Sequence, residues 1–314
     1  MGVFVLKRVA WTAAVVIGVS LLTFFMLFVL PGDPAEMLAI SKYGAQDATR
    51  EAIEAIKIRE GLDRPIPVQY GVWLGGVLTG DLGKSRLSGK PVWDEIVSRL
   101  PATLALAGTS LLLSLGIGMS LGIIAAVRRN TLWDYLFTGG SLIGVAIPNF
   151  WLGLMLILIF GIYLRLLPTF GYGTWRHLIL PAFTVGISMA GITARLTRST
   201  VIEVLSQDYI KTARAKGLAS GLILYRHVIK NALIPIITIA GIQFGYLLEG
   251  TVIIEMVFAW PGIGRLLIDA VHNRDFPLIQ GCVLYIAFIF CFVNLLLDVF
   301  YSYLDPRVRL EQHD

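Results

Sequence analysis

The chain contains six long runs that are almost free of charged residues. A helix rises about 1.5 Å per residue, so about 20 apolar residues cross a hydrocarbon core of roughly 30 Å. The runs are Val9–Leu30, Pro101–Val127, Tyr135–Leu164, Leu178–Ala194, Asn231–Ile254 and Phe276–Leu297. Apolar residues are continuous in them and do not alternate with polar ones, which favours spanning helices over strands. The pattern predicts an all-α polytopic membrane protein with six transmembrane helices.

Composition excludes a water-soluble protein. Hydrophobic residues make up 56% of the chain, charged residues 15%, and the mean hydropathy is +0.75. The two cysteines, Cys282 and Cys291, lie in one apolar run, where we expect them to pack rather than to bind metal. Lys7 and Arg8 precede the first run as in a signal peptide, but that run is longer than such peptides require, so we expect a retained span.

The distribution of basic residues predicts the orientation. With six spans both termini share a side, and that side carries most of the basic residues that are close to the spans: Lys7, Arg8, Arg128, Arg129, seven residues between Arg195 and Lys230, Arg307 and Arg309. The short loops opposite contain Arg165, Arg176, Arg265 and Arg274. The positive-inside rule therefore places both termini in the cytoplasm. The net charge of +5 is then better explained by lipid headgroups and a cytoplasmic partner than by nucleic acid.

Three regions follow from this topology: an N-terminal region with the first span (1–30), an extracytoplasmic cap (31–100) and a five-helix core (101–314). In the cap, Asp47 is the expected N-cap of a helix that ends near Glu60, with Ile53 and Ile56 as a narrow apolar face. A second short segment, Val68–Leu78, is expected at the outer interface.

The cytoplasmic connection 195–230 is longer than a turn between two spans requires. Ile202, Leu205, Tyr209 and Ala213 recur at helical spacing and predict one apolar stripe, and Gly217 permits a sharp reversal. Two interpretations fit these residues equally: a helical hairpin on the headgroups, or a docking helix for a soluble partner.

Several motifs carry little functional signal. Gly83-Lys84-Ser85 resembles the end of a phosphate-binding loop, but Leu78 stands where the first glycine belongs. Three G-x-x-x-G pairs, at Gly118/Gly122, Gly140/Gly144 and Gly241/Gly245, are interpreted as helix-packing positions. The four histidines, at 177, 227, 272 and 313, show no metal-ligand spacing, and we propose no catalytic residue and no metal site.

Polar groups inside spans are candidates for a substrate path. A carboxylate in a bilayer is costly unless it faces protein or water, so Glu249 either lines an aqueous path or forms a buried pair. Asp298 lies near the end of its span, where it can reach headgroup water. Pro148, before Asn149, breaks the third span and predicts a hinge or a cavity wall there.

A family resemblance rests on several segments in order. They are Leu30-Pro31-Gly32-Asp33-Pro34, Asp208-Tyr209-Ile210-Lys211-Thr212-Ala213-Arg214-Ala215-Lys216-Gly217-Leu218, Arg226-His227, Asn231-Ala232-Leu233-Ile234-Pro235, Phe258-Ala259-Trp260-Pro261-Gly262-Ile263-Gly264-Arg265, Arg274-Asp275-Phe276-Pro277-Leu278-Ile279-Gln280 and Leu304-Asp305-Pro306-Arg307. Together they resemble permeases of ABC importers from the dipeptide, oligopeptide and nickel branch, over nearly the whole chain.

The resemblance implies a type I importer permease fold in the bacterial inner membrane. It implies a homologous second permease, two cytoplasmic ATPases that bind ATP and Mg, and an extracytoplasmic binding protein, with no cofactor on this chain. The ATPase-coupling residues would be Tyr209, Ile210, Lys211, Thr212, Ala213, Arg214, Ala215, Lys216 and Gly217. Lys211-Thr212-Ala213 departs from the general Glu-Ala-Ala pattern, so a glutamate contact to the ATPase is not implied.

The expected function is therefore ATP-driven import without enzymatic activity of this chain. Peptides are the leading cargo, with nickel chelates or glutathione as alternatives. A polytopic enzyme would need clustered polar residues at one membrane face, and a secondary transporter would be expected to show inverted repeats. The sequence shows neither feature.

Overall fold

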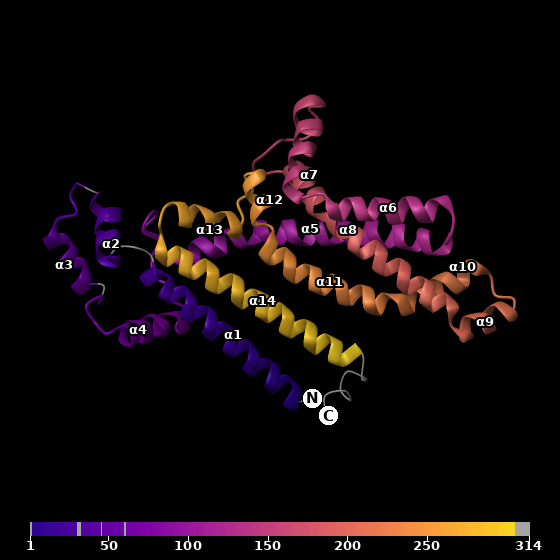
Figure 1. Ribbon diagram of the computed structural model, residues 1–314, viewed down its shortest axis with the longest axis horizontal. Helices are drawn as coiled ribbons and strands as arrows, with labels where there is room; N and C mark the ends of the chain where they lie inside the picture. Colours follow the sequence, from indigo (N-terminus) through magenta and orange to yellow (C-terminus); the bar gives the residue numbers. More distant parts are fainter. Residues whose placement is uncertain (1, 30–32, 45, 60, 305–314) are drawn as a thin grey trace. The chain divides into compact units, whose positions relative to one another are not determined.

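The computed structural model describes residues 2–29, 33–44, 46–59 and 61–304, which form helices and turns with one isolated antiparallel bridge, between Lys84 and Pro91. The chain divides into two compact units, Met1–Pro101 with Gly262–Leu295 and Ala102–Pro261 with Leu296–Asp314. The division falls inside two long helices, α5 and α14, shown in Figure 1.

Unit 1 is the smaller of the two and combines helices from two separate segments of the chain. It contains α1 (Gly2–Val29), α2 (Pro34–Tyr43), α3 (Arg50–Arg59), α4 (Ile66–Leu78), the beginning of α5 (Val92–Val127), α13 (Ile263–His272) and most of α14 (Phe276–Leu304). Its core is formed where Val92, Ile96, Leu266 and Cys282 pack together, all buried. The expectation that Cys282 is a packing residue is confirmed.

Unit 2 contains the remaining elements. They are the rest of α5, α6 (Leu132–Ala146), α7 (Asn149–Leu156), the π-helix η1 (Ile157–Tyr163), α8 (Trp175–Ser206), α9 (Asp208–Ala215), α10 (Ser220–Ile223), the π-helix η2 (Leu224–Ile229), α11 (Lys230–Gly250), α12 (Val252–Val257) and the end of α14. One buried cluster includes Leu106, Leu180, Leu247 and Phe258, and a second surrounds α9.

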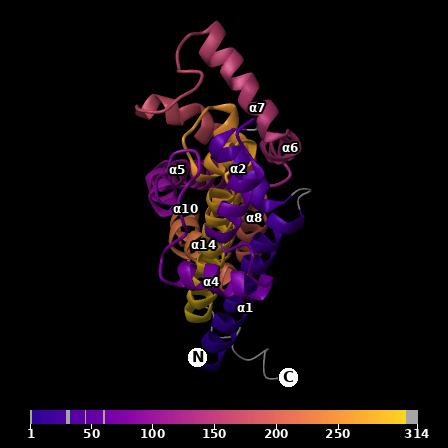
Figure 2. The ribbon, with the colours of Figure 1, turned by 90° about the vertical axis from the view of Figure 1, so that its left-hand side faces the viewer.

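The six predicted apolar runs correspond to helices. Five are long and apolar enough to cross a membrane, and α6 with the helix 149–163 forms a sixth candidate, bent by 101° at its break. The break lies at Pro148, as predicted, because a residue before proline is forced out of the helical region and Ile147 is extended (φ −75°, ψ 126°). Figures 1 and 2 show α7 projecting away from α6 and α8.

Several predicted boundaries were wrong, the first two because charged residues interrupt the apolar pattern. α5 begins at Val92 rather than Pro101, because Val92 and Ile96 are buried while Asp94 and Glu95 occupy the first turns. α8, expected to end at Ala194, continues to Ser206. The fifth run was expected to continue to Ile254, but α11 ends at Gly250 and α12 follows after one residue.

The cap was predicted in part. The helix expected from Asp47 is α3, but its cap is Thr49, whose hydroxyl accepts from the amide of Ala52 (3.3 Å). Helix α2 was not predicted, and Asp33 caps it. Ile56 is buried as expected, against two alanines of α2.

The second cap segment is α4, close to its predicted range. It packs against α1 through aromatic rings, with Phe24 at 5.4 Å from Tyr70 and 5.6 Å from Trp73 between ring centroids. The hydroxyls of Ser20 and Tyr70 are 2.7 Å apart. Both views show α4 beside α1 (Figures 1 and 2).

Candidate functional site

The long connection 195–230 folds as a helical hairpin in unit 2. α8 ends at Ser206, Gln207 is extended (φ −69°, ψ 149°), and α9 begins at Asp208. Asp208 in the first turn and Arg214 in the last turn complement the helix dipole. The predicted apolar stripe holds for Ile202, Leu205 and Ala213, which pack in one cluster. It was wrong at Tyr209, because the helix that was expected to carry all four residues is broken at Gln207.

The buried face of α9 differs from the predicted one. Ile210 is fully buried and Ala213 is 8% exposed, whereas Tyr209, which was assigned to the stripe, is 44% exposed. Ile210 and Ala213 pack against Val201 of α8 and Val228 of η2, among other buried residues. Because Gln207 is extended, α9 does not continue the helical repeat of α8. Ile210 therefore turns inward and Tyr209 outward.

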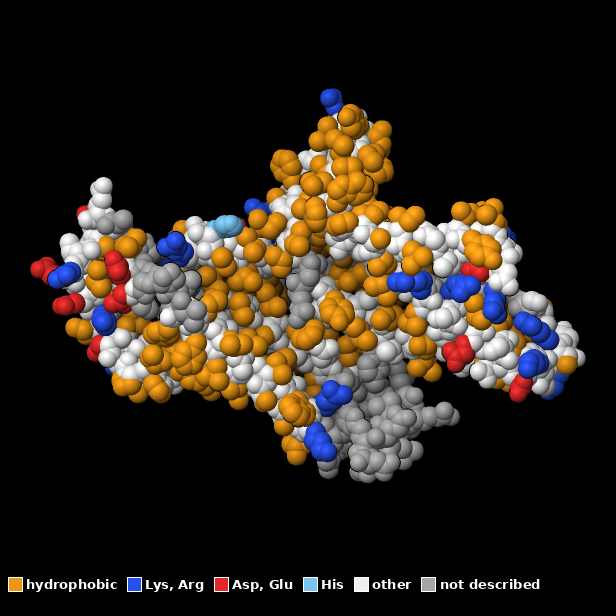
Figure 3. Space-filling view, in the orientation of Figure 1, with side chains coloured by type: hydrophobic (Ala, Val, Ile, Leu, Met, Phe, Trp, Pro, Cys, Tyr) orange, Lys and Arg blue, Asp and Glu red, His pale blue; other side chains and the backbone are white. Residues whose placement is uncertain are grey.

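The remaining residues of α9 and of the turn that follows it are exposed. Lys211, Thr212, Arg214, Ala215 and Lys216 all face outward. Lys211 pairs with Asp208 one turn before it, at 2.8 Å. Figure 3 shows Lys and Arg side chains gathered over the end of unit 2 that holds α9 and α10. The nine predicted coupling residues thus form one short helix and its C-terminal turn, with two residues inward and the others accessible.

Gly217 terminates α9, as its sequence position predicted. Its φ of +77° is in the left-handed region that favours glycine. The amide of Gly217 donates to the carbonyl of Arg214 (2.9 Å), and that of Leu218 donates to the carbonyl of Ala213 (3.3 Å). These two bonds form a Schellman motif, which reverses the chain toward α10.

A side-chain hydrogen bond joins the hairpin to the next span. The Asn231 amide on α11 donates to the hydroxyl of Tyr209 at 2.9 Å and to the carbonyl of His227 at 2.8 Å. Ile210 packs in the same cluster as Val201 and Ala232. A force on α9 therefore reaches both α8 and α11.

The three predicted path residues are not brought together by a described contact. Pro148 and Asn149 lie at the exposed break between α6 and α7. Glu249 is in the last turn of α11, but its side chain lies outside the described residues, as does that of Asp298. Among the described residues no three His, Cys, Asp or Glu side chains form a group that could hold a metal ion.

A buried carboxylate that the sequence analysis missed lies just beyond the fifth run. Glu255 of α12 is 0% exposed, and its Oε1 accepts from the hydroxyls of Thr103 (3.1 Å) and Thr251 (3.0 Å). Close by in sequence, Trp260 donates to the carbonyl of Ala102 at 2.8 Å. The only local signal for this site was a glutamate directly after an apolar run.

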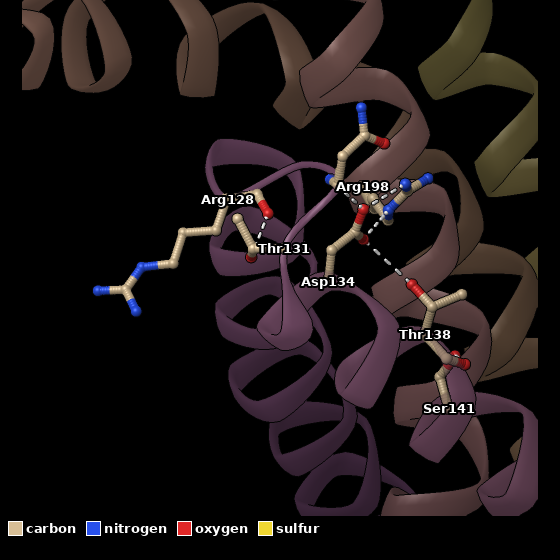
Figure 4. Close-up of polar contacts among 7 residues, drawn as sticks. Arg128, Thr131, Asp134, Thr138, Ser141 and Arg198 are labelled. Carbon is tan, nitrogen blue, oxygen red and sulfur yellow. Dashed lines mark hydrogen bonds and ion pairs between the residues drawn. The ribbon is translucent and has the colours of Figure 1, made fainter.

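A second missed group is an ion pair between α6 and α8. Arg198 donates to both carboxylate oxygens of Asp134, at 2.6 and 2.8 Å, and Asp134 is 3% exposed. The same carboxylate accepts from the backbone amide of Asn130 (3.0 Å) and the hydroxyl of Thr138 (3.4 Å). Figure 4 shows the carboxylate between Arg198 and Thr138, with Arg128 pointing away from it. The ion pair joins α6 to α8, and the bond from Asn130 holds the turn between α5 and α6.

Small residues bring α5 and α8 into close contact. A Cβ atom at Gly118 would lie 2.6 Å from Cβ of Thr193, and one at Gly122 would lie 2.5 Å from the carbonyl oxygen of Ala194. The interpretation of this glycine pair as a packing motif is confirmed. Next to it, the Thr193 hydroxyl of α8 accepts from the side-chain amide of Gln243 on α11 (3.1 Å) and lies 3.1 Å from the Ser114 hydroxyl of α5, so three helices share a buried polar contact.

The loop with Gly83-Lys84-Ser85 has a structural role in unit 1. The carboxylate of Asp275 accepts from the Ser85 hydroxyl (2.6 Å) and the Arg86 amide (2.9 Å), and Asp275 is 1% exposed. A further oxygen of Asp275 accepts from the amide of Leu278 at the beginning of α14 (3.3 Å). These bonds explain why a carboxylate precedes Phe276-Pro277.

Two family models match the chain. Residues 118–310 match the family described as binding-protein-dependent transport system inner membrane component, and residues 1–107 match the N-terminal part described for the same kind of membrane component. The first match alone covers more than half of the chain.

Curated relatives and solved structures agree with this match. The chain is 42% identical to the glutathione transport system permease protein GsiC of Escherichia coli O6:H1 and of Salmonella typhimurium, over 98% of both chains in each case. Two solved structures share the fold: an amino acid ABC transporter (TM-score 0.54, 15% identity, 67% of this chain and 94% of that one) and the MetNI methionine ABC transporter (0.54, 17%, 67% and 96%). The chain belongs to the binding-protein-dependent transport system inner membrane components and is a permease subunit of an ABC importer of the peptide/nickel type.

Proposed function

We propose that this permease subunit imports short peptides and that glutathione, a tripeptide, is the first cargo to test. The supporting observation is the 41–42% identity to permeases named for glutathione transport, over nearly their full length. Nickel chelates are the second candidate class. A chelated ion needs no protein ligands, so the lack of a metal-ligand cluster among the described residues does not decide between them.

Energy for import is proposed to enter through α9. The observation that supports this assignment is the two-sided character of the helix: Ile210 and Ala213 are buried against α8, η2 and α11, while Tyr209 and the residues from Lys211 to Lys216, other than Ala213, remain accessible. A rigid helix that is held on one face and free on the other suits a groove on a soluble ATPase. ATP and Mg then belong to the partner subunits.

The proposed assembly contains this chain, a homologous second permease, two cytoplasmic ATPases and an extracytoplasmic binding protein. The proposed location is the bacterial inner membrane, with both termini in the cytoplasm, as the positive-inside rule indicates. Pro148 and Asn149 at the exposed break, together with Glu249, are proposed to line the path that cargo follows between the two permeases.

The cargo is tested with the complete transporter. The chain is co-purified with its ATPases and second permease, reconstituted in proteoliposomes and supplied with the binding protein loaded with glutathione, a dipeptide or a nickel chelate. We expect stimulated ATP hydrolysis and uptake with the peptide ligands. Stimulation by the nickel chelate alone would replace the peptide assignment, and mass spectrometry of the ligand co-purified with the binding protein provides an independent answer.

The orientation is tested by labelling. Arg214→Cys on α9 and Lys90→Cys in the cap are compared in intact cells with a membrane-impermeant thiol reagent, because the native Cys282 and Cys291 are buried. We expect labelling of the cap variant only. Labelling of Arg214→Cys from outside would place α9 on the wrong side for a cytoplasmic ATPase and would overturn the coupling proposal.

A further inference from the structure

A shallow groove of about 390 Å³ lies in unit 2, at the turn between α5 and α6. Its lining includes Ile124, Val127, Arg128, Trp133, Phe137 and Leu224. The aliphatic residues and the two aromatic rings make the groove apolar, and Arg128 supplies a cation in its lining. The groove therefore combines an apolar surface with one positive group, and this arrangement suits an anionic amphiphile.

The cation of this groove is not neutralised by the carboxylate beside it. Asp134 pairs with Arg198 instead, and Figure 4 shows Arg128 pointing away from both. The guanidinium of Arg128 lies over the Trp133 ring, 5.7 Å from its centroid, and the next residue, Arg129, is exposed. Two adjacent cations beside an indole ring are typical of the headgroup level of a membrane.

The turn that carries Arg128 is fixed in place. The Thr131 hydroxyl donates to the carbonyl of Arg128 at 2.6 Å, and the amide of Asn130, in the left-handed region at φ +62°, donates to Asp134 at 3.0 Å. The ring of Trp133 lies 5.7 Å from that of Phe137 between centroids. The groove is thus formed before any ligand arrives, which lowers the entropic cost of binding.

We propose that this groove is a specific site for an anionic phospholipid, with the phosphate at Arg128 and Arg129 and one acyl chain along Val127, Phe137 and Leu224. The groove walls belong to helices apolar enough to cross a membrane, so acyl chains are the medium that surrounds them. Basic pockets between spanning helices favour anionic headgroups because a phosphate accepts charge-assisted hydrogen bonds from guanidinium groups. Leu224 is in η2, so bound lipid contacts the hairpin that also carries α9.

The test uses the full chain in detergent and counts bound lipid by native mass spectrometry. The probes are dioleoylphosphatidylglycerol, dioleoylphosphatidylcholine and glycerol 3-phosphate, which separate the charge from the acyl chains. We expect retention of phosphatidylglycerol over the other two. Arg128→Gln is expected to weaken phosphatidylglycerol binding at least about fivefold, and Trp133→Ala to weaken it as well, while Arg128→Lys retains most of the binding.

Arg176→Gln is the matched control. Arg176 lies over the ring of Trp175 at the same 5.7 Å, at the beginning of α8, and is not among the groove residues. Its substitution removes an equal charge and an equal ring contact, so binding should remain at the wild-type level. Equal retention of both phospholipids, or wild-type affinity of Arg128→Gln, would overturn the proposal. Unchanged lipid binding by Arg128→Gln with loss of ATPase co-purification would also overturn it and would assign the groove to a protein partner.

Discussion

The Asn231 side chain donates a hydrogen bond to the hydroxyl of Tyr209, at 2.9 Å, and so ties the first turn of α11 to the first turn of α9. These two residues are far apart in the sequence, on either side of the hairpin reversal. Tyr209 is 44% exposed, so this bond is a polar connection between the accessible face of the hairpin and a spanning helix. A push on α9 can therefore move α11 directly rather than through the apolar cluster alone.

Removal of this bond is expected to weaken coupling. A hydrogen bond between neutral groups contributes about 0.5–1.5 kcal/mol, so Tyr209→Phe should lower cargo transported per ATP by roughly two- to tenfold in proteoliposomes. Asn231→Ala should cause little further loss of coupling when combined with Tyr209→Phe, because the shared contact is already absent and the other bond of Asn231, to the His227 carbonyl one turn earlier, does not involve α9. Tyr225→Phe, at a residue that is 78% exposed, is the control. Fully additive effects of the two substitutions would contradict the link.

The reversal after α9 depends on one backbone conformation. Gly217 has φ +77°, and a Cβ atom added there would meet no atom within 4 Å beyond its own neighbours, so a larger residue is opposed only by the backbone. Left-handed geometry costs a residue such as leucine about 1–2 kcal/mol. Gly217→Leu should therefore leave the chain inserted but reduce transport per ATP, whereas Gly217→Asn should be tolerated.

A matched control for this substitution lies four residues away. Gly221 also has open space around its Cβ position, but its φ is not in the left-handed region. Gly221→Leu should thus behave like the wild type in the same assay of uptake and hydrolysis. If Gly217→Leu and Gly221→Leu lowered coupling equally, added bulk rather than the backbone turn would be responsible, and the Schellman motif would lose its assigned role.

The contact between α5 and α8 predicts a position-specific effect on stability. Gly118→Ala introduces a Cβ at 2.6 Å from Thr193 and 2.8 Å from the carbonyl oxygen of Ala190, so it should destabilise the protein by about 1–3 kcal/mol. Gly116→Ala on the same helix meets no atom within 4 Å and should be neutral or slightly stabilising. Thermal unfolding in detergent compares them, and an equal loss in both variants would contradict the proposed packing.

Much of the fold could be predicted because apolar runs report membrane-spanning helices directly. The break at Pro148 and the reversal at Gly217 were predicted for the same kind of reason, since each depends on the backbone chemistry of one residue. The N-terminal turns of α5 were missed because charged residues interrupt their apolar pattern. There, Val92 and Ile96 are buried by contacts within unit 1, which a run-length criterion does not detect.

The candidate site was harder to predict because its geometry depends on which face of α9 turns inward and on residues that are distant in the sequence. Tyr209 was assigned to the buried stripe, and only the break at Gln207 turns Ile210 inward in its place. Glu255 meets Thr103, and Asp134 meets Arg198, across long stretches of sequence. Neither pair has a local spacing signal, so neither the carboxylates nor their partners were predicted from the sequence.

The ion pair between Asp134 and Arg198 makes an asymmetric prediction. Asp134 is 3% exposed and Arg198 is 29% exposed, so an unpaired carboxylate is left away from water, whereas an unpaired guanidinium can still be hydrated. Arg198→Met should therefore destabilise the protein by about 2 kcal/mol or more and Asp134→Asn by about 1 kcal/mol. Asparagine also retains an oxygen that can accept from the amide of Asn130, which keeps the turn between α5 and α6 partly fixed. Thermal unfolding of both variants in the same detergent checks the order, with Arg195→Met on the neighbouring turn as a control for the loss of one charge. A larger loss for Asp134→Asn than for Arg198→Met would show that the carboxylate, rather than the arginine, has the better access to water.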